Sequence, residues 1–232
     1  MAQRRLIESA SPVADPQVSS LTDQVYERVR QEIIEAKWRP GQILVEPELA
    51  AQYGVSKTPV REALRLLVQA DWVVSMPRKG YLVQPLRLGD IGEVFGLRAM
   101  IEPILFAEAA GAANPQGVEM LRARLQDQRS ARSDLRGSLE AARLFHLAGA
   151  QISRNRRAES ILERLLAEVS RLHYLMPNVE SHINSDVELE AHRAILEAVE
   201  ARDPDAASAL MREHLNEVAR TMVSAFAFVP QE

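Results

Sequence analysis

The sequence has no cysteine, which excludes disulfide bonds, thiol nucleophiles and cysteine-held metals. Aromatic residues make up only 5% of the 232 residues, and the abundance of alanine, leucine, glutamate and arginine favours helices. No apolar run approaches the roughly 20 residues that a membrane-spanning helix needs. The first residues include two arginines but no continuous apolar stretch of the secretory type. We therefore expect a cytoplasmic protein with no membrane partner.

A large excess of one charge sign is also absent, since the formal net charge is -4. Residues 1–86 hold 11 Lys and Arg against 10 Asp and Glu, whereas residues 87–232 hold 17 against 22. The basic residues of the first part are concentrated at 57–65 and 78–79. Local clustering of basic residues indicates nucleic-acid binding better than net charge does. This distribution therefore permits a DNA-binding N-terminal part.

Residues 47–63, PELAAQYGVSKTPVREA, predict two short helices joined by a tight turn. Gly54 is free to adopt the positive φ that such a turn needs. Ser56 is expected to cap the second helix through its side-chain oxygen, and Pro59 falls in the first turn, where a missing N–H is harmless. The second helix should bury a stripe at helical spacing, made of Val60, Ala63, Leu64 and Leu67.

Lys57, Arg61 and Arg65 recur every four residues on a different face of that second helix. A helix with an apolar side and a basic N-terminal end suits the major groove of DNA. Two expected strands follow at 72–75 and 80–83, and the loop between them is basic at Lys79. Gly80 would let the backbone approach a phosphate or a groove closely. The alternative is an ordinary helical hairpin with solvated basic residues, and a strand hairpin that only covers the core.

An amphipathic helix at 20–36 precedes this region, and every periodic segment after residue 86 is helical. The predicted fold is mainly α: an N-terminal winged helix-turn-helix and a C-terminal six-helix antiparallel bundle. The bundle helices are expected at 90–113, 116–132, 138–153, 158–176, 185–201 and 204–225. The predicted parts are a flexible arm (1–18), the DNA-binding domain (19–86), a linker (87–90), the helical bundle domain (91–226) and a tail (227–232).

All five histidines lie in the second half, and three of them sit on apolar stripes of separate helices: His146, His192 and His214. Imidazoles on the inward faces of different helices can converge, and three histidines are an ordinary ligand set for Zn²⁺ or a similar ion. Small residues around His146 would leave room for a ligand. The alternative is three unrelated core histidines, each with its own hydrogen bond. His173 and His182 have no such neighbours and are expected at the surface or lining the bundle.

The stretch EPELAAQYGVSKTPVREALRLLVQADWVVSMPRKGYLV resembles the winged helix-turn-helix of the GntR family of bacterial transcription regulators, from about residue 21 to 85. In the FadR-like subfamily the matching positions contact operator DNA. The resemblance therefore implies DNA contacts for Ser56, Lys57, Thr58, Arg61 and Gly80. Lys57 stands where the family usually has arginine, so a bidentate guanine contact becomes a single-point one. Pro47 stands where an arginine often contacts DNA, so that contact is absent.

Residues from about 90 to 225 resemble the ligand-binding domain of the same subfamily, and six helices rather than seven indicate its VanR-type branch. Many members bind a divalent metal through an aspartate and three histidines. The matching histidines are His146, His192 and His214, but Ala142 stands at the aspartate position. The resemblance implies a divalent ion, Zn²⁺ or else Ni²⁺ or Mn²⁺, held without that carboxylate. A metal-free pocket is the alternative.

The same resemblance implies an organic acid or a sugar acid as the effector, bound beside the metal. Arg98, in the family-like setting Leu97-Arg98-Ala-Met-Ile-Glu102, is the candidate partner for the effector's carboxylate. The alternative is a surface arginine, or one paired with Glu102 across a helical turn.

These features predict a metabolite-responsive bacterial transcription regulator rather than an enzyme. The resemblance implies a repressor, because most relatives repress, although the residues themselves do not give the sign of regulation. A palindromic double-stranded DNA operator requires a homodimer, and the first bundle helix, through Phe95, Met100 and Ile104, is expected to contribute to it. Two alternatives remain open. One is a metal-dependent hydrolase that uses the three histidines. The other is a constitutive DNA-binding protein with an inert bundle.

Overall fold

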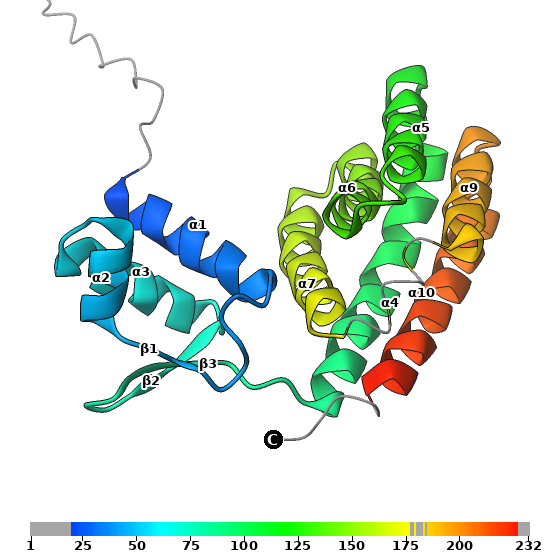
Figure 1. The fold of residues 1–232 in the computed structure, drawn as a ribbon. Helices are drawn as coiled ribbons and strands as arrows, with labels where there is room; N and C mark the ends of the chain where they lie inside the picture. The colour runs from blue at the N-terminus through cyan, green and yellow to red at the C-terminus, as the bar shows by residue number, and fades with distance from the viewer. Residues whose placement is uncertain (1–19, 177–178, 180–182, 184, 227–232) are drawn as a thin grey trace, which may run out of the picture. The chain divides into compact units, whose positions relative to one another are not determined.

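The computed structural model describes residues 20–176, 179, 183 and 185–226. The predicted arm and tail, and His182, lie outside the described residues. Two compact units are present: one runs to Arg30 and resumes from Ile43 to Leu82, and the other comprises Gln31–Gln42 and the chain from Val83 onward. The fold is mainly helical, with a small sheet in the first unit and a helical domain in the second (Figure 1). The predicted fold class is confirmed.

The N-terminal part is a winged helix-turn-helix (Figure 1). Its sheet has the order β1-β3-β2, and β1 runs antiparallel to β3 with Ile43 opposite Leu82. The strands β2 and β3 form the predicted hairpin. In chain order the elements are α1 (Leu21–Ile34), β1 (Ile43–Leu44), α2 (Glu46–Tyr53), α3 (Lys57–Gln69), β2 (Val73–Met76) and β3 (Gly80–Val83).

The turn between α2 and α3 forms largely as its residues predict. Gly54 ends α2 in the left-handed region at φ 68°, and its N–H donates to the carbonyl of Ala50. The α3 stripe is completely buried, at Val60, Ala63, Leu64 and Leu67. Ser56 does occupy the N-cap position, but its side chain makes no capping hydrogen bond, so that part of the prediction is wrong. Its backbone is extended and its side chain is exposed, which leaves the hydroxyl at the surface.

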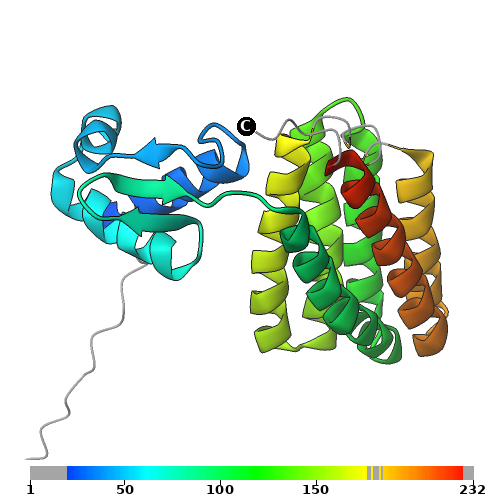
Figure 2. The same ribbon diagram turned by 90° about the horizontal axis from the view of Figure 1, so that it is seen from below.

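The second unit is a bundle in which α4 packs against α6, α7, α9 and α10, and α5 packs against α6 and α9. Figures 1 and 2 show α4 and α10 side by side. The described part of this unit contains the six predicted helices, which are α4 (Leu88–Gly111), α5 (Pro115–Ser130), α6 (Leu135–Ser153), α7 (Arg156–Leu175), α9 (Asp186–Glu200) and α10 (Pro204–Phe226). None of the described helices is long and apolar enough to cross a membrane.

Side-chain caps set several of the bundle boundaries. The Asn114 side chain accepts from the N–H of Gly117, and that of Asp203 accepts from the N–H of Ala206. The start of α6 lies three residues before the predicted Ser138, because both carboxylate oxygens of Asp134 accept backbone N–H groups of the first turn. A capped first turn needs no apolar periodicity, which is why the pattern alone placed the start too late.

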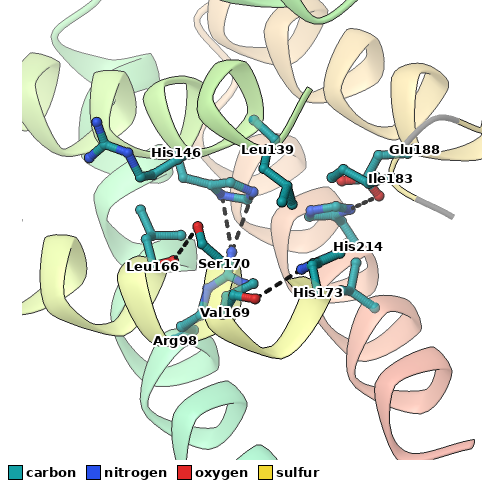
Figure 3. Close-up of a pocket in the computed structure, with 13 residues that line it drawn as sticks. Arg98, Leu139, His146, Leu166, Val169, Ser170, His173, Ile183, Glu188 and His214 are labelled. Carbon is teal, nitrogen blue, oxygen red and sulfur yellow. Dashed lines mark hydrogen bonds and ion pairs between the residues drawn. The ribbon is translucent and has the colours of Figure 1, made fainter. Parts of the chain in front are cut away.

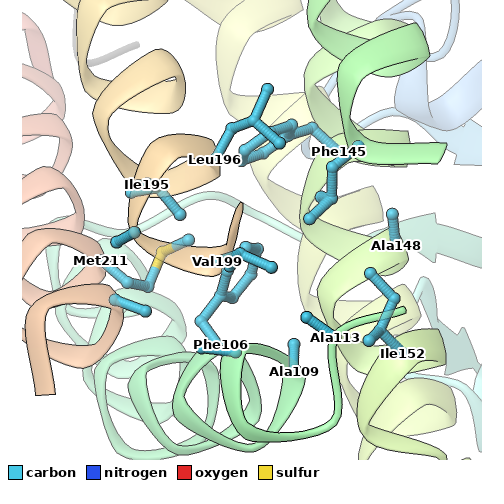
Figure 4. Packing of buried hydrophobic residues seen from close by; sticks show 14 of the residues in the cluster. Phe106, Ala109, Ala113, Phe145, Ala148, Ile152, Ile195, Leu196, Val199 and Met211 are labelled. Atoms are coloured by element: carbon cyan, nitrogen blue, oxygen red, sulfur yellow. The ribbon is translucent and has the colours of Figure 1, made fainter. Parts of the chain in front are cut away.

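The main core cluster gathers around Phe106 and Phe145, whose ring centroids lie 5.9 Å apart (Figure 4). A Cβ added at Gly149 would lie 2.4 Å from the Phe106 ring. Gly149 therefore admits Phe106 and leaves no room for a ligand, whereas Ala142, another small residue on the face of His146, does line a cavity, so the prediction is wrong for Gly149 alone. Phe95 is also a core residue rather than a dimer contact, because it is buried with Ile91 and Val94 in a second cluster.

Candidate functional site

Three helices of the bundle bring three histidines together in its interior. His146 comes from α6, His192 from α9 and His214 from α10, and all three are buried. Their ring centroids lie 4.8 to 5.3 Å apart. One potential ligand atom from each residue lies within 4.8 Å of the others. The three histidines therefore lie close enough for a small inward shift to bring them around one ion, and their ligand role stays a prediction.

A glutamine on α5 fixes the proton position of His192. The Oε1 atom of Gln128 lies 2.7 Å from Nδ1 of His192, and an amide oxygen only accepts, so Nδ1 carries the ring proton. The lone pair then lies on Nε2, which has no hydrogen-bond partner among the described residues although it is fully buried. An imidazole held this way, with its lone pair directed away from the partner, is the usual state of a metal-ligating histidine. The donor set therefore fits a divalent ion.

A buried ion pair fixes His146 in a similar way. Glu102 Oε2 lies 2.5 Å from Nδ1 of His146, and Glu102 Oε1 lies 2.5 Å from Nε of Arg98. Arg98 therefore pairs with Glu102, which was the alternative to an effector contact. Its Nη2 atom also lies 3.3 Å from Nε2 of His146, and Figure 3 shows the guanidinium directed at that ring. Burial opposes ionisation of Glu102, but Arg98 and His146 outweigh it and lower the pKa of this carboxyl to about 2.

Glu188 of α9 lies on the other side of the cluster, beside His214 in Figure 3. It is buried, with Oε1 3.6 Å from Nε2 of His192 and Oε2 3.7 Å from Nδ1 of His214. Burial lowers the pKa of His214 to about 4 and that of His192 well below its usual value, although Glu188 acts in the opposite direction. Both rings are therefore neutral at pH 7, the state that metal ligation requires.

A small cavity of about 30 Å³ adjoins the histidines. The cavity has room for an ion or a water molecule, and it is far smaller than the roughly 300–1,000 Å³ of pockets that enclose organic ligands. His173, which is buried, is a lining residue and not a surface one. Around the histidines the polar and small lining residues include Arg98, Ala142, Ser170, His173 and Glu188.

In the N-terminal unit, the structure exposes all but one of the predicted DNA-contact residues. Two of the arginines are already paired with carboxylates: Arg61 with Glu46 of α2, and Arg65 with Glu62. The Arg61 pair uses both carboxylate oxygens of Glu46, at 2.9 to 3.1 Å. The exposed predicted residues are Ser56, Lys57, Thr58, Arg61, Arg65 and Lys79, whereas Gly80 is partly buried.

Gly80 has a local structural reason to be glycine. Its φ is +115°, and an added Cβ would lie 2.4 Å from the carbonyl oxygen of Leu44 in β1. The residue therefore allows β1 and β3 to approach closely. Its predicted DNA contact stays a prediction.

Two of the residues that orient the histidines could not be found from the sequence. Gln128 lies 64 positions from His192 and Glu102 lies 44 from His146, so only the tertiary fold brings these pairs together. Glu188 did leave a signal, since it precedes His192 by four positions and so shares its helix face.

Comparison with known families covers most of the chain. Residues 21–83 match the family described as bacterial regulatory proteins, gntR family. Residues 93–217 match the FCD domain family.

Curated relatives and a solved structure agree with these matches. The HTH-type transcriptional repressor RspR of Escherichia coli (strain K12) is 28% identical over 205 residues, which is 87% of this chain and 89% of that protein. A probable D-xylose utilization operon transcriptional repressor of Paenarthrobacter nicotinovorans is 28% identical over 85% of this chain and 86% of its own length. The structure of E. coli McbR/YncC shares the fold, with a TM-score of 0.78 at 24% identity over 90% of this chain and 100% of that one.

Proposed function

The chain belongs to the GntR family of bacterial transcription regulators, in the FadR-like group with an FCD domain, and on this premise we propose that it is a metabolite-responsive repressor. It acts in the cytoplasm as a homodimer on a palindromic operator, and an organic acid or sugar acid bound in the bundle changes its DNA affinity. The observation that carries the proposal is the pairing of an exposed basic recognition helix with a buried three-histidine cluster in one chain.

The N-terminal end of α3 offers the residues for operator contact. Ser56, Lys57 and Thr58 are exposed there, with the free N–H groups of the first turn beside them. Arg61 lies one turn further on. Its pair with Glu46 uses Nε and Nη2, so other guanidinium N–H groups are left to reach a phosphate or a base edge. Glu46 would hold the arginine in place before DNA arrives, which reduces the entropy lost on binding. The proposed contact surface continues along α3 through Arg65. It also includes Lys79 and Gly80 in the hairpin of β2 and β3, which is the wing of this fold.

The dimer contact is proposed for α4. Leu97, Met100 and Ile104 are 46%, 69% and 57% exposed and recur at spacings of three and four residues, so they form one apolar stripe. A stripe of this kind on a helix is expected to be covered by a partner. A second copy of the chain is the partner that a palindromic operator requires.

The effector site is proposed around Arg98 and the three histidines. A divalent ion held by His146, His192 and His214 would supply a Lewis-acidic anchor for a carboxylate oxygen. Arg98 would supply the second anchor: Glu102 accepts its Nε–H, and the N–H groups of its two Nη atoms can still donate to a carboxylate. The cavity of about 30 Å³ cannot hold such an acid, so binding must move the helices that line it. An effector that binds only the enlarged state shifts the bundle toward that state.

A hydrogen bond from Arg171 connects α7, a helix that lines the cavity, to the chain segment that follows β3. Arg171 of α7 is buried, and its Nη2 donates to the carbonyl of Gln84 at 2.6 Å. Val169, Ser170 and His173, from the same turns of α7, line the cavity. A movement of α7 would therefore displace Gln84, which is the residue directly after β3.

The proposal is tested by selecting duplexes from a random DNA pool with the full-length protein. The expected result is a palindrome whose half-sites lie about one helical turn apart. Lys57→Ala should weaken binding and lower the salt dependence, while Lys37→Ala, which removes a cation outside α3 and the wing, should leave both unchanged. A pool that never enriches, or a Lys57→Ala variant with unaltered binding, would contradict the proposed interface.

A further inference from the structure

The expected metal site lacks its usual carboxylate, because Ala142 presents only a methyl group to the cavity. Two other buried carboxylates lie beside the histidines, Glu102 and Glu188. Which of them could complete a metal site depends on which carboxylate oxygens lie near the ligand nitrogens of the histidines. The inference rests on the proposed metal site and assigns a further ligand to it.

Both carboxylate oxygens of Glu102 already accept hydrogen bonds, from Arg98 and His146. Its Oε1 receives the Arg98 Nε–H and its Oε2 receives the His146 Nδ1–H, both at 2.5 Å. Ligation through Glu102 would break the contact that neutralises a buried guanidinium, and it would release the ring of His146. Glu102 therefore orients a ligand and does not serve as one.

Glu188 faces the ligand atoms themselves. Its Oε1 lies 3.6 Å from Nε2 of His192, the lone-pair nitrogen that has no hydrogen-bond partner among the described residues. Its Oε2 lies 3.7 Å from Nδ1 of His214. Atoms that share one ion at about 2.0–2.2 Å lie roughly 3.0–3.5 Å from each other. A contraction of a few tenths of an ångström would therefore bring each Glu188 oxygen to ligand spacing from its histidine nitrogen, while the histidine ligand atoms, which lie within 4.8 Å of one another, would have to close further around the ion.

The position of Glu188 is fixed by the capped start of α9. It lies in the first turn of α9, where its backbone N–H donates to the side chain of the N-cap residue Ser185. His192 lies four positions further on the same helix, so one rigid element carries both donors. Rigid placement on a helix is what a metal ligand needs.

We propose that Glu188 is the carboxylate ligand of a divalent metal site completed by His146, His192 and His214, in place of the aspartate that the family carries at position 142. Three nitrogen donors and one carboxylate suit Zn²⁺, and also Ni²⁺ or Mn²⁺. The carboxylate adds a negative charge on the side of the cluster opposite Arg98, whose guanidinium lies 3.3 Å from His146 Nε2. That charge offsets the repulsion between the guanidinium and an incoming cation.

The test is Zn²⁺ binding by the full chain after removal of metal, measured by competition with a chromophoric chelator, with the absorption spectrum of the Co²⁺-loaded protein as a second readout. Four variants are compared: Glu188→Gln, Ala142→Asp with Glu188→Gln, Glu190→Gln, and the triple alanine variant of the three histidines. Glu190 is the matched control, since it lies on the same helix but pairs at the surface with Arg193.

The proposal expects one ion per wild-type chain, at least tenfold weaker Zn²⁺ binding and a changed Co²⁺ spectrum in Glu188→Gln, and wild-type behaviour in Glu190→Gln. Restored affinity in the Ala142→Asp double variant would show that the missing carboxylate, and not a folding defect, caused the loss. Unchanged binding in Glu188→Gln, with binding lost in the triple variant, overturns the role of Glu188 and leaves the three-histidine site standing. A wild-type chain that binds no metal overturns both.

Discussion

At the scale of single residues, two buried hydrogen bonds hold the rings of His192 and His146 in place. Gln128 and Glu102 each accept the Nδ1 proton of one histidine, and this leaves the Nε2 lone pairs of His192 and His146 facing the cluster. Arg98 Nη2 lies 3.3 Å from Nε2 and 3.4 Å from Nδ1 of His146, so it lies against the ring and not along one lone pair. A metal ion bound at Nε2 would therefore lie close to this guanidinium, and the two positive charges would repel each other.

The Arg98–Glu102 pair gives a stability prediction. Arg98→Met should lower the free energy of unfolding by about 3–5 kcal/mol, because it leaves the buried Glu102 carboxylate without its main cation. Replacing both residues by methionine should cost less than the single change, since no buried charge remains. Urea unfolding of the metal-free proteins measures both values. A double variant less stable than the single one would show that the pair is held by packing and not by charge.

Acid should destabilise the metal-free protein in two stages. His214 has its pKa lowered from 6.5 to about 4 by burial, so the unfolded chain takes up a proton that the folded chain refuses as the pH falls from 6.5 to 4. That shift corresponds to about 3 kcal/mol of stability lost over this window. Glu102, lowered from 4.5 to about 2, adds a further loss between pH 4.5 and 2. Urea unfolding across pH should show a steeper slope in wild type than in His214→Gln between pH 4 and 6.5, and equal slopes would contradict the assignment.

The sequence allowed the three clustered histidines to be predicted, but not the polar residues that lie beside them. The three histidines were predictable because each sits on an apolar stripe, and an apolar stripe marks the inside of a helix. Gln128 was not, since nothing in a polar residue of α5 signals which buried nitrogen it will meet. Glu188 was readable in principle from its four-residue spacing to His192, but acidic residues at that spacing are common on solvated faces.

At the scale of elements, helix existence followed from periodicity, whereas the boundaries followed from caps. Asp134 extends α6 by a turn that carries no apolar pattern, and Leu21 of α1 is exposed although it continues the stripe of Val25, Val29 and Ile33. The first turn of a helix often lies beyond the core that the stripe covers, so periodicity alone cannot place it.

The contact between α4 and α6 at Gly149 gives a prediction at this scale. Gly149→Ala should destabilise the bundle by about 1–3 kcal/mol, because the new Cβ would lie 2.4 Å from the Phe106 ring in a filled core. Gly92→Ala in α4, where a Cβ meets nothing within 4 Å, should instead stabilise by about 0.5–1 kcal/mol through helix propensity. Thermal unfolding of the two variants distinguishes packing from propensity. Equal stabilisation by both would mean that Phe106 moves aside freely.

At the scale of the whole molecule, the predicted dimer depends on the α4 stripe. Met100→Asp should convert the dimer to a monomer in sedimentation velocity and weaken operator binding, because a monomer engages only one half-site. Met120→Asp is the matched control, since Met120 is also exposed but lies on α5. A Met100→Asp protein that sediments as a dimer would place the contact elsewhere.

The proposal that the bundle is a ligand sensor is tested most directly by operator affinity. Fluorescence anisotropy of the selected duplex would be measured with metal-loaded wild type and with the triple alanine variant of His146, His192 and His214, across a panel of organic acids and sugar acids. We predict that at least one acid changes the wild-type Kd by tenfold or more, equivalent to about 1.4 kcal/mol of coupling, and leaves the variant's Kd unchanged. An operator Kd that no acid alters in the wild type would contradict the sensor and identify a constitutive DNA-binding protein with an inert bundle.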